Sequence, residues 1–421
     1  MKPHSPFRVP QQRVGVVVTA ATAGLAAAMG VGRFAYTPLL PIMIDAAGLT
    51  HAQGAFVATA NYVGYLGGAV LLTVRPQWST LRGHRYLAVC LVVSELGMAV
   101  TTSVPLWSIL RFIAGLASAG IFVACVQNVS RLNIGRGASA LATGVAFAGV
   151  GIGIALTGVV VLVFNGALSW RGLWLSLAGI TAVLVVPLVF RSCPTGPAVE
   201  SRWNKRDVHD PTRQLRWALL IAVYFLEGVG YIIVGTFLVV AVADKGSSAA
   251  GPVVWIVVGV AAAPATLVWT AAARRIGAAT ALLIALVAQA VGTFVPTIST
   301  AIPAAILAAI LFGATFMGIT ALAIRLGTDI CGPAAAAPLT AMYGLGQIVG
   351  PVGVAPLLGS AGYFRAFEVA TCVLVTGAIL TWVLFGVHRN QTRRHRRPIP
   401  RELSVVAPPK ELWRDECERL H

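Results

Sequence analysis

The stretch Ala138–Phe164 reads ASALATGVAFAGVGIGIALTGVVVLVF and contains no charged side chain. A helix needs about 20 mostly apolar residues to cross a bilayer, so this stretch is long enough to span one. The composition of the whole chain agrees, because 57% of its 421 residues are hydrophobic and only 11% are charged. Soluble domains carry roughly 25% charged residues. The sequence therefore predicts an integral membrane protein.

Eleven other segments have a similar length and apolar character, and none alternates apolar and polar residues as a strand would. An open sheet could not span lipid in any case, because its edge groups would have no partners. We therefore predict an all-α polytopic protein of twelve transmembrane helices. With the first stretch in its place, the segments are Val14–Leu40, Gln53–Val74, Tyr86–Thr101, Leu106–Val129, Ala138–Phe164, Leu173–Phe190, Trp217–Ala243, Pro252–Ala273, Ala278–Val295, Ile302–Leu326, Pro338–Leu358 and Phe364–Val387.

The polar stretch 191–216 divides these segments into two sets of six. We accordingly expect an N-terminal half over residues 14–190 and a C-terminal half over residues 217–387, joined by a cytoplasmic linker. Residues 1–13 would form a cytoplasmic N-terminus, and residues 388–421 a basic cytoplasmic tail.

The net charge of +17 is explained by where the basic residues lie. With the N-terminus inside, 26 of the 31 basic residues fall on the inner side, three on the outer side and two within helices. This asymmetry follows the positive-inside rule and predicts an inner-membrane protein with both termini in the cytoplasm. Nucleic acid is therefore not expected as a partner. The run Arg393–Arg397 indicates either binding to anionic lipid or a disordered topogenic segment.

The two sets of six helices also match each other in sequence. Gly30–Gly32 recurs as Gly228–Gly230, and Gly115 recurs as Gly313, in both cases 198 residues later. Two further pairs of helices match in the same order at nearly the same offset. Because both halves would start on the same side of the membrane, we expect parallel repeats related by an axis along the membrane normal.

This layout resembles that of the major facilitator superfamily, and local motifs support the resemblance. Leu110–Gly115 is similar to the helix-4 motif with its embedded arginine, and Gly346–Pro351 is similar to the glycine–proline motif of helix 11. The string GVGRFAYTPLLP, Gly30–Pro41, resembles the YbfB-like branch more closely. The resemblance implies a transporter that works by alternating access. One departure is that the loop 75–85 lacks the aspartate of the superfamily's Gly-x-x-x-Asp-Arg motif.

Three ionisable side chains inside predicted helices are candidates for proton coupling, since charge within a bilayer is costly and calls for a reason. Glu95 and Arg111 lie at equal distances from a turn near Ser103. They can therefore meet, either as a proton-sensitive pair or as a purely structural ion pair. Glu227 lies near the middle of its helix with no basic neighbour in the sequence. Its carboxyl either carries protons, contacts substrate or bonds to a neighbouring helix.

Arg33, in the outer part of the first helix, either reaches the outer surface or recognises an anion at the outer mouth of a cavity. Six other polar side chains are candidates for substrate contact or for bonds between helices: Tyr36, Asn61, Tyr65, Tyr231, Tyr343 and Gln347. Small-residue spacings and one internal proline indicate close helix packing and hinges: Gly32, Gly64, Gly68, Gly149, Gly153, Gly346, Gly350 and Pro351.

The chain has no nucleotide-binding, zinc-protease or serine-hydrolase motif. We therefore expect a transporter without a cofactor, not an enzyme. The favoured prediction is a monomeric secondary transporter that exports a small organic solute in exchange for protons. The alternatives are an uncoupled facilitator and a membrane sensor or scaffold that keeps the same fold.

Overall fold

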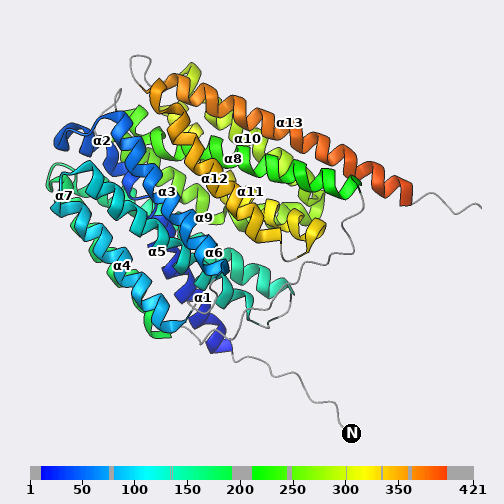
Figure 1. Cartoon of the computed structure of the whole chain (residues 1–421), viewed down its shortest axis with the longest axis horizontal. Coiled ribbons are helices and arrows are strands. Elements are labelled where there is room, and N and C mark those ends of the chain that lie inside the picture. The colour runs from blue at the N-terminus through cyan, green and yellow to red at the C-terminus, as the bar shows by residue number, and fades with distance from the viewer. Residues whose placement is uncertain are drawn as a thin grey trace, which may run out of the picture.

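The computed structural model describes residues 11–74, 80–132, 134, 136–191, 211–243, 249–299, 301–332, 335–358 and 363–395. Helices account for nearly all of these residues (Figure 1). The predicted lipid contact of the basic tail lies outside the residues whose side chains are described, as does the loop 75–79.

The first span is built from three pieces: α1 (Gln11–Leu25), the π-helix η1 (Ala26–Val31) and α2 (Tyr36–Ala47). Five continuous helices complete the N-terminal half: α3 (His51–Val74), α4 (Leu81–Val100), α5 (Val104–Ser130), α6 (Arg136–Phe164) and α7 (Trp170–Arg191). The C-terminal half consists of α8 (Pro211–Ala243), α9 (Ala250–Ile276), α10 (Ala278–Ile298), α11 (Ile302–Cys331), α12 (Ala336–Val354) with its 3-10 extension η5 (Ala355–Leu357), and α13 (Phe364–His395).

Eleven of the described helical segments are long and apolar enough to cross a membrane. The twelfth helix of the bundle is α12, whose sequence is less apolar because it includes Thr340, Tyr343, Gln347 and several glycines. The described ranges contain no β-strand element. The prediction of an all-α polytopic fold with two sets of six helices is therefore confirmed.

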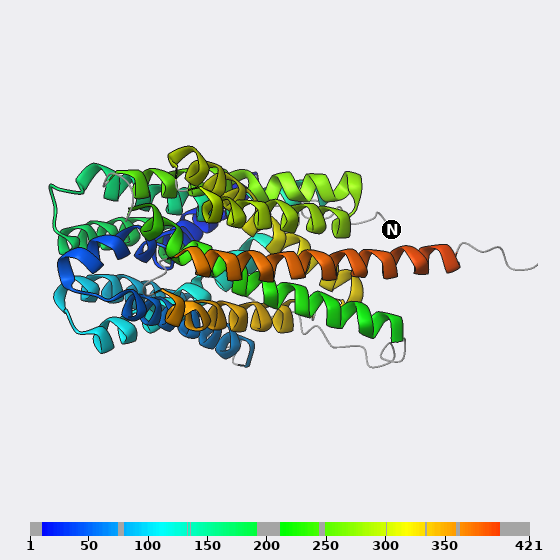
Figure 2. The same cartoon turned by 90° about the horizontal axis from the view of Figure 1, so that it is seen from above.

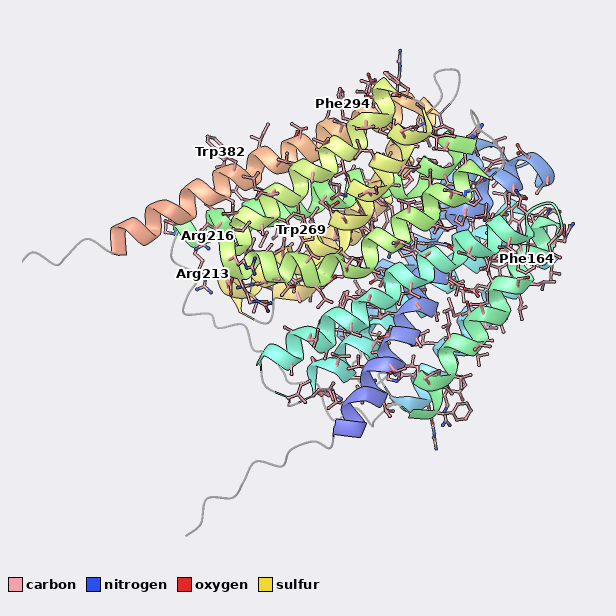
Figure 3. All side chains as sticks on the ribbon, turned by 180° about the vertical axis from the view of Figure 1, so that it is seen from behind. Phe164, Arg213, Arg216, Trp269, Phe294 and Trp382 are labelled. Carbon is pink, nitrogen blue, oxygen red and sulfur yellow. The ribbon has the colours of Figure 1, made fainter. Side chains whose placement is uncertain are left out.

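Several helices extend beyond the apolar segments that the sequence defines, among them the first span, which ends at Ala47 rather than Leu40. The helix α8 begins at Pro211 rather than Trp217, and α13 continues to His395 rather than Val387. Basic side chains stabilise the added turn of α8, where Arg213 donates from Nε to the carbonyl of Ile330 at 2.7 Å. Figure 3 shows Arg213 at this end of the bundle. Hydropathy therefore marks the apolar part of a helix, whereas its hydrogen bonds set where it ends.

The two halves lie side by side, with α3 next to α12 and α6 next to α9 (Figure 1). An even number of spans brings the start of α1 and the end of α13 to the same end of the bundle, which we call the terminal end (Figure 2). The opposite end, where α2 meets α3, is called the far end.

The repeat seen in the sequence also appears as contacts between the halves. Arg33 Nη2 donates to the hydroxyl of Tyr231, 198 residues away, at 3.3 Å. Thr37 Oγ1 donates to the carbonyl of Gly235, again 198 residues away, at 2.8 Å. Equivalent positions of two repeats can touch each other only close to the axis that relates them. The first span and α8 therefore meet at this axis.

The glycines proposed for helix packing lie at close approaches between backbones. A β-carbon on Gly64 would lie 2.0 Å from the carbonyl oxygen of Phe112, and one on Gly346 would lie 2.3 Å from that of Phe225. At each of the seven positions the nearest atom would lie under 3 Å away: Gly32, Gly64, Gly68, Gly149, Gly153, Gly346 and Gly350. Pro351 lies inside α12.

Large apolar side chains cover the outside of the bundle (Figure 3). Phe164 is 43% exposed, Phe294 is 48% exposed and Trp382 is 65% exposed. Exposed apolar surface on this scale is unfavourable in water and suits a lipid environment. The inside of the bundle therefore holds the polar side chains that need another explanation.

We predict that G64A destabilises the protein, because the added methyl group must push α3 away from α5. Overpacking of this kind costs about 1–3 kcal/mol. The matched control is G179A in α7, where a β-carbon would have nothing within 4 Å. Thermal unfolding of the purified proteins in detergent should show a lower midpoint for G64A and an unchanged or slightly higher one for G179A. Equal midpoints for G64A and wild type would contradict the close packing of α3 on α5.

Candidate functional site

The first span breaks between Val31 and Tyr36, next to a proline. Pro38 has no N–H, so it cannot donate to the carbonyl of Phe34 as a helix would require. That carbonyl accepts from the N–H of Thr37 instead, at 3.2 Å. In a regular helix the N–H of Thr37 would donate to the carbonyl of Arg33. The shift therefore leaves the carbonyl of Arg33 without a backbone donor. Because lipid offers no hydrogen bonds, carbonyls freed in this way need partners within the protein.

Arg111 provides those partners. Its Nη1 donates to the carbonyl of Gly32 at 2.8 Å, and its Nη2 donates to the carbonyl of Arg33 at 2.7 Å. The side chain is 1% exposed, and its guanidinium carbon lies 5.3 Å from the centre of the Tyr36 ring. Arg111 therefore holds the broken first span against α5.

The ion pair expected between Glu95 and Arg111 is not formed. Both oxygens of the Glu95 carboxyl are buried without a hydrogen-bond partner among the described residues, as is Nε of Arg111. The hydroxyl of Thr181 in α7 approaches the carboxyl without a well-formed bond. The sequence argument matched the two depths but could not foresee that the break in the first span would occupy the guanidinium.

Arg33 lies inside the protein, where the two halves meet. Its side chain is only 2% exposed, so the expectation that it reaches the surface is wrong. Besides Tyr231, its Nη2 donates to Oε1 of Gln347 in α12. The guanidinium carbon lies 4.4 Å from the centre of the Tyr65 ring and 5.2 Å from that of Tyr62. Arg33 thus joins the first span to α3, α8 and α12.

The partners of Arg33 continue into a column of stacked aromatic rings from the C-terminal half. Tyr231 stacks on Tyr343 with ring centres 5.2 Å apart, and Tyr343 stacks on Tyr224 at 4.4 Å. On the other side, Tyr231 lies 5.9 Å from Phe316 with the two ring planes 7° apart. The planes of neighbouring rings differ by 15° at most. Tyr231, in the middle of this column, is the member that bonds to the guanidinium of Arg33.

Glu227 lies next to this column, beside Tyr343, and is fully buried. Its Oε1 accepts a hydrogen bond from Nε2 of Gln289 in α10 at 3.3 Å, while its Oε2 has no partner among the described residues. No basic side chain of the described chain forms an ion pair with it. The structure thus brings together Arg33, Tyr65, Tyr231, Tyr343, Gln347 and Glu227, all singled out from the sequence.

Two other candidates lie apart from this cluster and make bonds between helices. Tyr36 donates from its hydroxyl to the carbonyl of Gly54 at 3.2 Å. Asn61 donates from Nδ2 to the carbonyl of Arg111 at 3.0 Å. Both bonds lie within the N-terminal half and support the position of Arg111 and the first span.

The sequence argument missed several aromatic members of the cluster. Tyr62 bonds to the hydroxyl of Thr236 across the halves at 3.0 Å, and Phe34 contacts the ring of Phe316 edge-on at 6.2 Å. Phe34 stands in the string Gly30–Pro41 and Tyr62 directly follows Asn61, but nothing in their spacing indicated a contact. Gln289 could have been suspected, because it is an amide within an apolar helix.

The cluster is covered on the side of the far end. The bonds Thr37–Gly235 and Tyr62–Thr236 lie there, and beyond them Tyr363 bonds to His51. Every residue from 24 to 40 and from 227 to 240 is buried. Residues nearer the terminal end on α1 and α8, such as Thr19, are exposed. Arg33 is therefore not at an open mouth on the far side.

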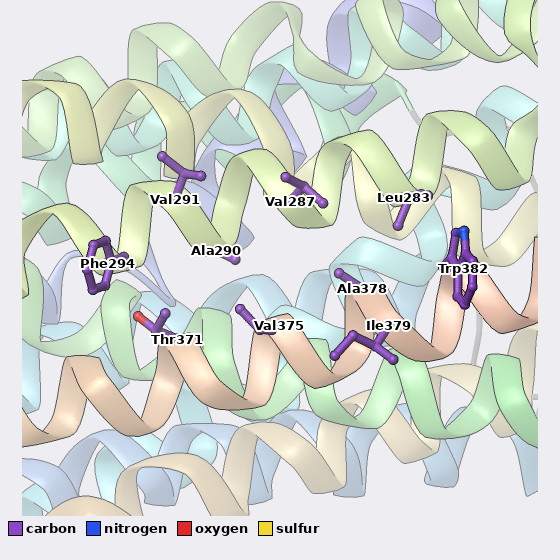
Figure 4. A pocket seen from close by; sticks show the side chains of 10 residues that line it. All are labelled: Leu283, Val287, Ala290, Val291, Phe294, Thr371, Val375, Ala378, Ile379 and Trp382. Carbon is purple, nitrogen blue, oxygen red and sulfur yellow. The ribbon is translucent and has the colours of Figure 1, made fainter.

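A separate groove of 600 Å³ lies between α10 and α13 (Figure 4). Its lining is apolar apart from Thr371 and the indole of Trp382, and Phe294 and Trp382 at its ends are exposed on the outside of the bundle. The groove offers no charged group and no group from the N-terminal half. It is part of the lipid-facing surface and not of the cluster.

Two parallel six-helix repeats that meet at a buried polar cluster define a membrane transporter of the major facilitator fold. The chain matches the family described as "Uncharacterised MFS-type transporter YbfB" over residues 25–382, and it belongs to that family. It is accordingly a transporter and not an enzyme.

A solved structure with a similar fold is the crystal structure of the nucleoside transporter NupG (D323A mutant). The TM-score is 0.70 at 14% sequence identity, over 88% of this chain and 100% of that chain. At this identity the likeness concerns the fold alone. No curated protein matches the chain.

We predict that R111M lowers stability, because it leaves the carbonyls of Gly32 and Arg33 buried without donors. An unsatisfied buried acceptor costs about 1–3 kcal/mol, and two are created. The matched control is R365M, which removes an exposed arginine from α13. Thermal unfolding in detergent should separate the two variants clearly. A midpoint for R111M equal to that of R365M would show that Arg111 does not hold the break.

Proposed function

We propose that this transporter exports a small organic solute by alternating access, coupled to protons, in the cell inner membrane. The observation that carries the proposal is that one buried cluster between the halves contains both a guanidinium, Arg33, and a carboxyl, Glu227. A group that can bind a solute and a group that can take up a proton therefore lie along the same interface.

Glu227 is the proposed main proton site. Burying a charged carboxylate without a cation is very costly, whereas the neutral acid is tolerated. Among the described residues, the amide of Gln289 donates to it, and the hydroxyl of Tyr343 approaches it without a well-formed bond. When helices move and water reaches the cluster, the cost of the charge falls and the proton can leave. Proton release is thereby coupled to conformation.

Glu95 is the proposed second proton site, with Arg111 modulating it. It lies in the N-terminal half, close enough for Arg111 to act on its charge through space without a direct bond. Since Arg111 binds the break in the first span, a change of charge on Glu95 would be felt by the helix that carries Arg33. The substrate contacts that we propose within the cluster are Arg33, Tyr65, Tyr231, Tyr343 and Gln347. Tyr36 and Asn61, the other two candidates from the sequence, would act on the substrate indirectly by supporting Arg111 and the first span.

The ties between the halves suit a reversible opening. Side-chain hydrogen bonds such as Thr37–Gly235 and Tyr62–Thr236 contribute about 0.5–1.5 kcal/mol each. A small amount of free energy from solute or proton binding is therefore enough to break them. With the terminal end in the cytoplasm, as the distribution of basic residues indicates, the covered side faces outward. The chain would act as a monomer, with its basic tail on anionic lipid.

We predict that E227Q uncouples transport from the proton gradient. Glutamine keeps the hydrogen bond to Gln289 but cannot exchange a proton. The measurement is solute accumulation in proteoliposomes, with and without an imposed pH gradient, using a solute found by thermal-shift screening. Gradient-driven accumulation should fall to the level of protein-free liposomes, while exchange of labelled solute at equal pH continues.

The control is E368Q, which removes an exposed carboxyl of α13 and should retain wild-type accumulation. If E227Q responds to the gradient like wild type, Glu227 is not the proton site. If wild type exchanges solute but ignores the gradient, the protein is an uncoupled facilitator.

A further inference from the structure

The charge at the interface of the two halves is unbalanced. Arg33 is 2% exposed, and in the described part of the chain no carboxylate lies within the 4.0 Å of an ion pair. Its partners are neutral: the hydroxyl of Tyr231, the amide oxygen of Gln347 and the rings of Tyr62 and Tyr65. Buried charges in proteins are normally paired or bind an ion. A permanent cation left without an anion here needs a partner that comes from elsewhere.

We propose that Arg33 binds the anionic group of the transported solute, and that this solute is a small monocarboxylate with a flat apolar body. The proposal deepens the proposed function, on which it rests for transport itself. An arginine edge presents two parallel N–H groups that match a carboxylate. Nε of Arg33 has no partner among the described residues, and Nη2 is held only by the two neutral groups. A carboxylate would take Nε and replace Gln347 at Nη2.

The number of buried guanidinium groups that can bind the solute limits the charge of the solute. In the described part of the chain the other buried arginine is Arg111, which already uses both terminal nitrogens for the carbonyls of Gly32 and Arg33. One guanidinium therefore remains for the solute, and one negative charge balances it. A second negative charge would lie near Glu227 or against the rings without a counter-ion, which is unfavourable.

The surroundings of Arg33 indicate the shape and polarity of the part of the solute that is attached to the carboxylate. One face of its guanidinium is covered by the Tyr65 ring at 4.4 Å. Tyr231, which bonds to Nη2, belongs to the column in which Tyr343, Tyr231 and Phe316 stack with neighbouring planes 7–10° apart. A flat apolar body attached to the carboxylate can pack its face against the edges of these rings, and edge-to-face aromatic pairs gain about 0.5–1.5 kcal/mol beyond burial. A bare anion would gain only the contact with Arg33.

Displacement of Gln347 links binding to movement. The bond from Arg33 to Gln347 joins the first span to α12 across the two halves. A carboxylate that takes the place of Oε1 removes that tie and leaves both halves in contact with the solute instead. Gln347 is thus the group at Arg33 that the carboxylate would replace.

The test measures the thermal stability of the purified protein in detergent at neutral pH against three probes: benzoate, its uncharged isostere benzamide, and acetate. A ligand raises the midpoint according to its concentration and affinity. Benzoate should stabilise wild type and R365Q, whereas benzamide should not, and acetate should act only at much higher concentration. Loss of a charge-assisted pair should weaken benzoate roughly ten- to a hundred-fold in R33Q.

Two further variants keep the result decisive if R33Q folds poorly. R33K retains the charge but not the two-pronged edge, so it should bind benzoate more weakly than wild type and still favour it over benzamide. Q347A removes the competing acceptor and should bind benzoate more tightly. The proposal would be overturned by any of three results. These are equal stabilisation by benzoate and benzamide, unchanged benzoate binding in R33Q or R33K, and no stabilisation by benzoate. Weaker benzoate binding in Q347A would overturn the displacement of Gln347, and acetate as effective as benzoate would overturn the flat body.

Transport of the solute is tested separately from its binding. If benzoate binds through Arg33 but does not exchange across proteoliposomes, the proposed transport of this solute class fails while the binding site stands. If an uncharged solute exchanges and E227Q uncouples it, the proposed function stands and the carboxylate assignment fails.

Discussion

The requirement that every backbone carbonyl within a membrane be hydrogen-bonded sets the arrangement of this protein. Pro38 interrupts the first span, and Arg111 makes the interruption tolerable by donating to the carbonyls of Gly32 and Arg33. Because the break lies at Arg33, that side chain is held where the first span meets α8 and α12. One arginine thus satisfies the backbone, and the other is thereby positioned for the proposed solute.

The axis between the repeats explains why the cluster draws on both halves. At this axis, positions 198 residues apart face each other, so Arg33 meets Tyr231 and Thr37 meets Gly235. Identical residues at such positions would be redundant, and two arginines would repel each other. The repeats have instead diverged there, and the C-terminal half contributes rings and Glu227, one helical turn before Tyr231. Anion binding by Arg33 and proton binding by Glu227, the proposed main proton site, therefore belong to different halves.

Much of the fold could be predicted because lipid imposes a simple rule on composition. Apolar length gave the twelve helices, and the glycine pattern gave the two repeats, since backbone contacts such as Gly64 with Phe112 exclude larger residues. The positions of charged side chains were harder to predict. The failed pairing of Glu95 with Arg111 and the inward position of Arg33 both depend on the break after Val31. Hydropathy does not detect such a break, because it is averaged over a long window and treats Val14–Ala47 as one apolar span.

The two interfaces between the halves differ in a way that limits how the cluster can open. Along α6 and α9 the backbones touch, since a β-carbon on Gly151 would lie 2.5 Å from the carbonyl of Gly259 and one on Gly259 would lie 2.6 Å from that of Gly151. Along α3 and α12 the contact is made by side chains, as where Leu66 faces Gly344. Backbones packed this closely can rotate against each other but separate only by losing the whole contact, whereas side chains can exchange partners one at a time. The structure therefore favours a pivot at α6 and α9 with an opening beside α3 and α12, which is the side on which Gln347 contacts Arg33.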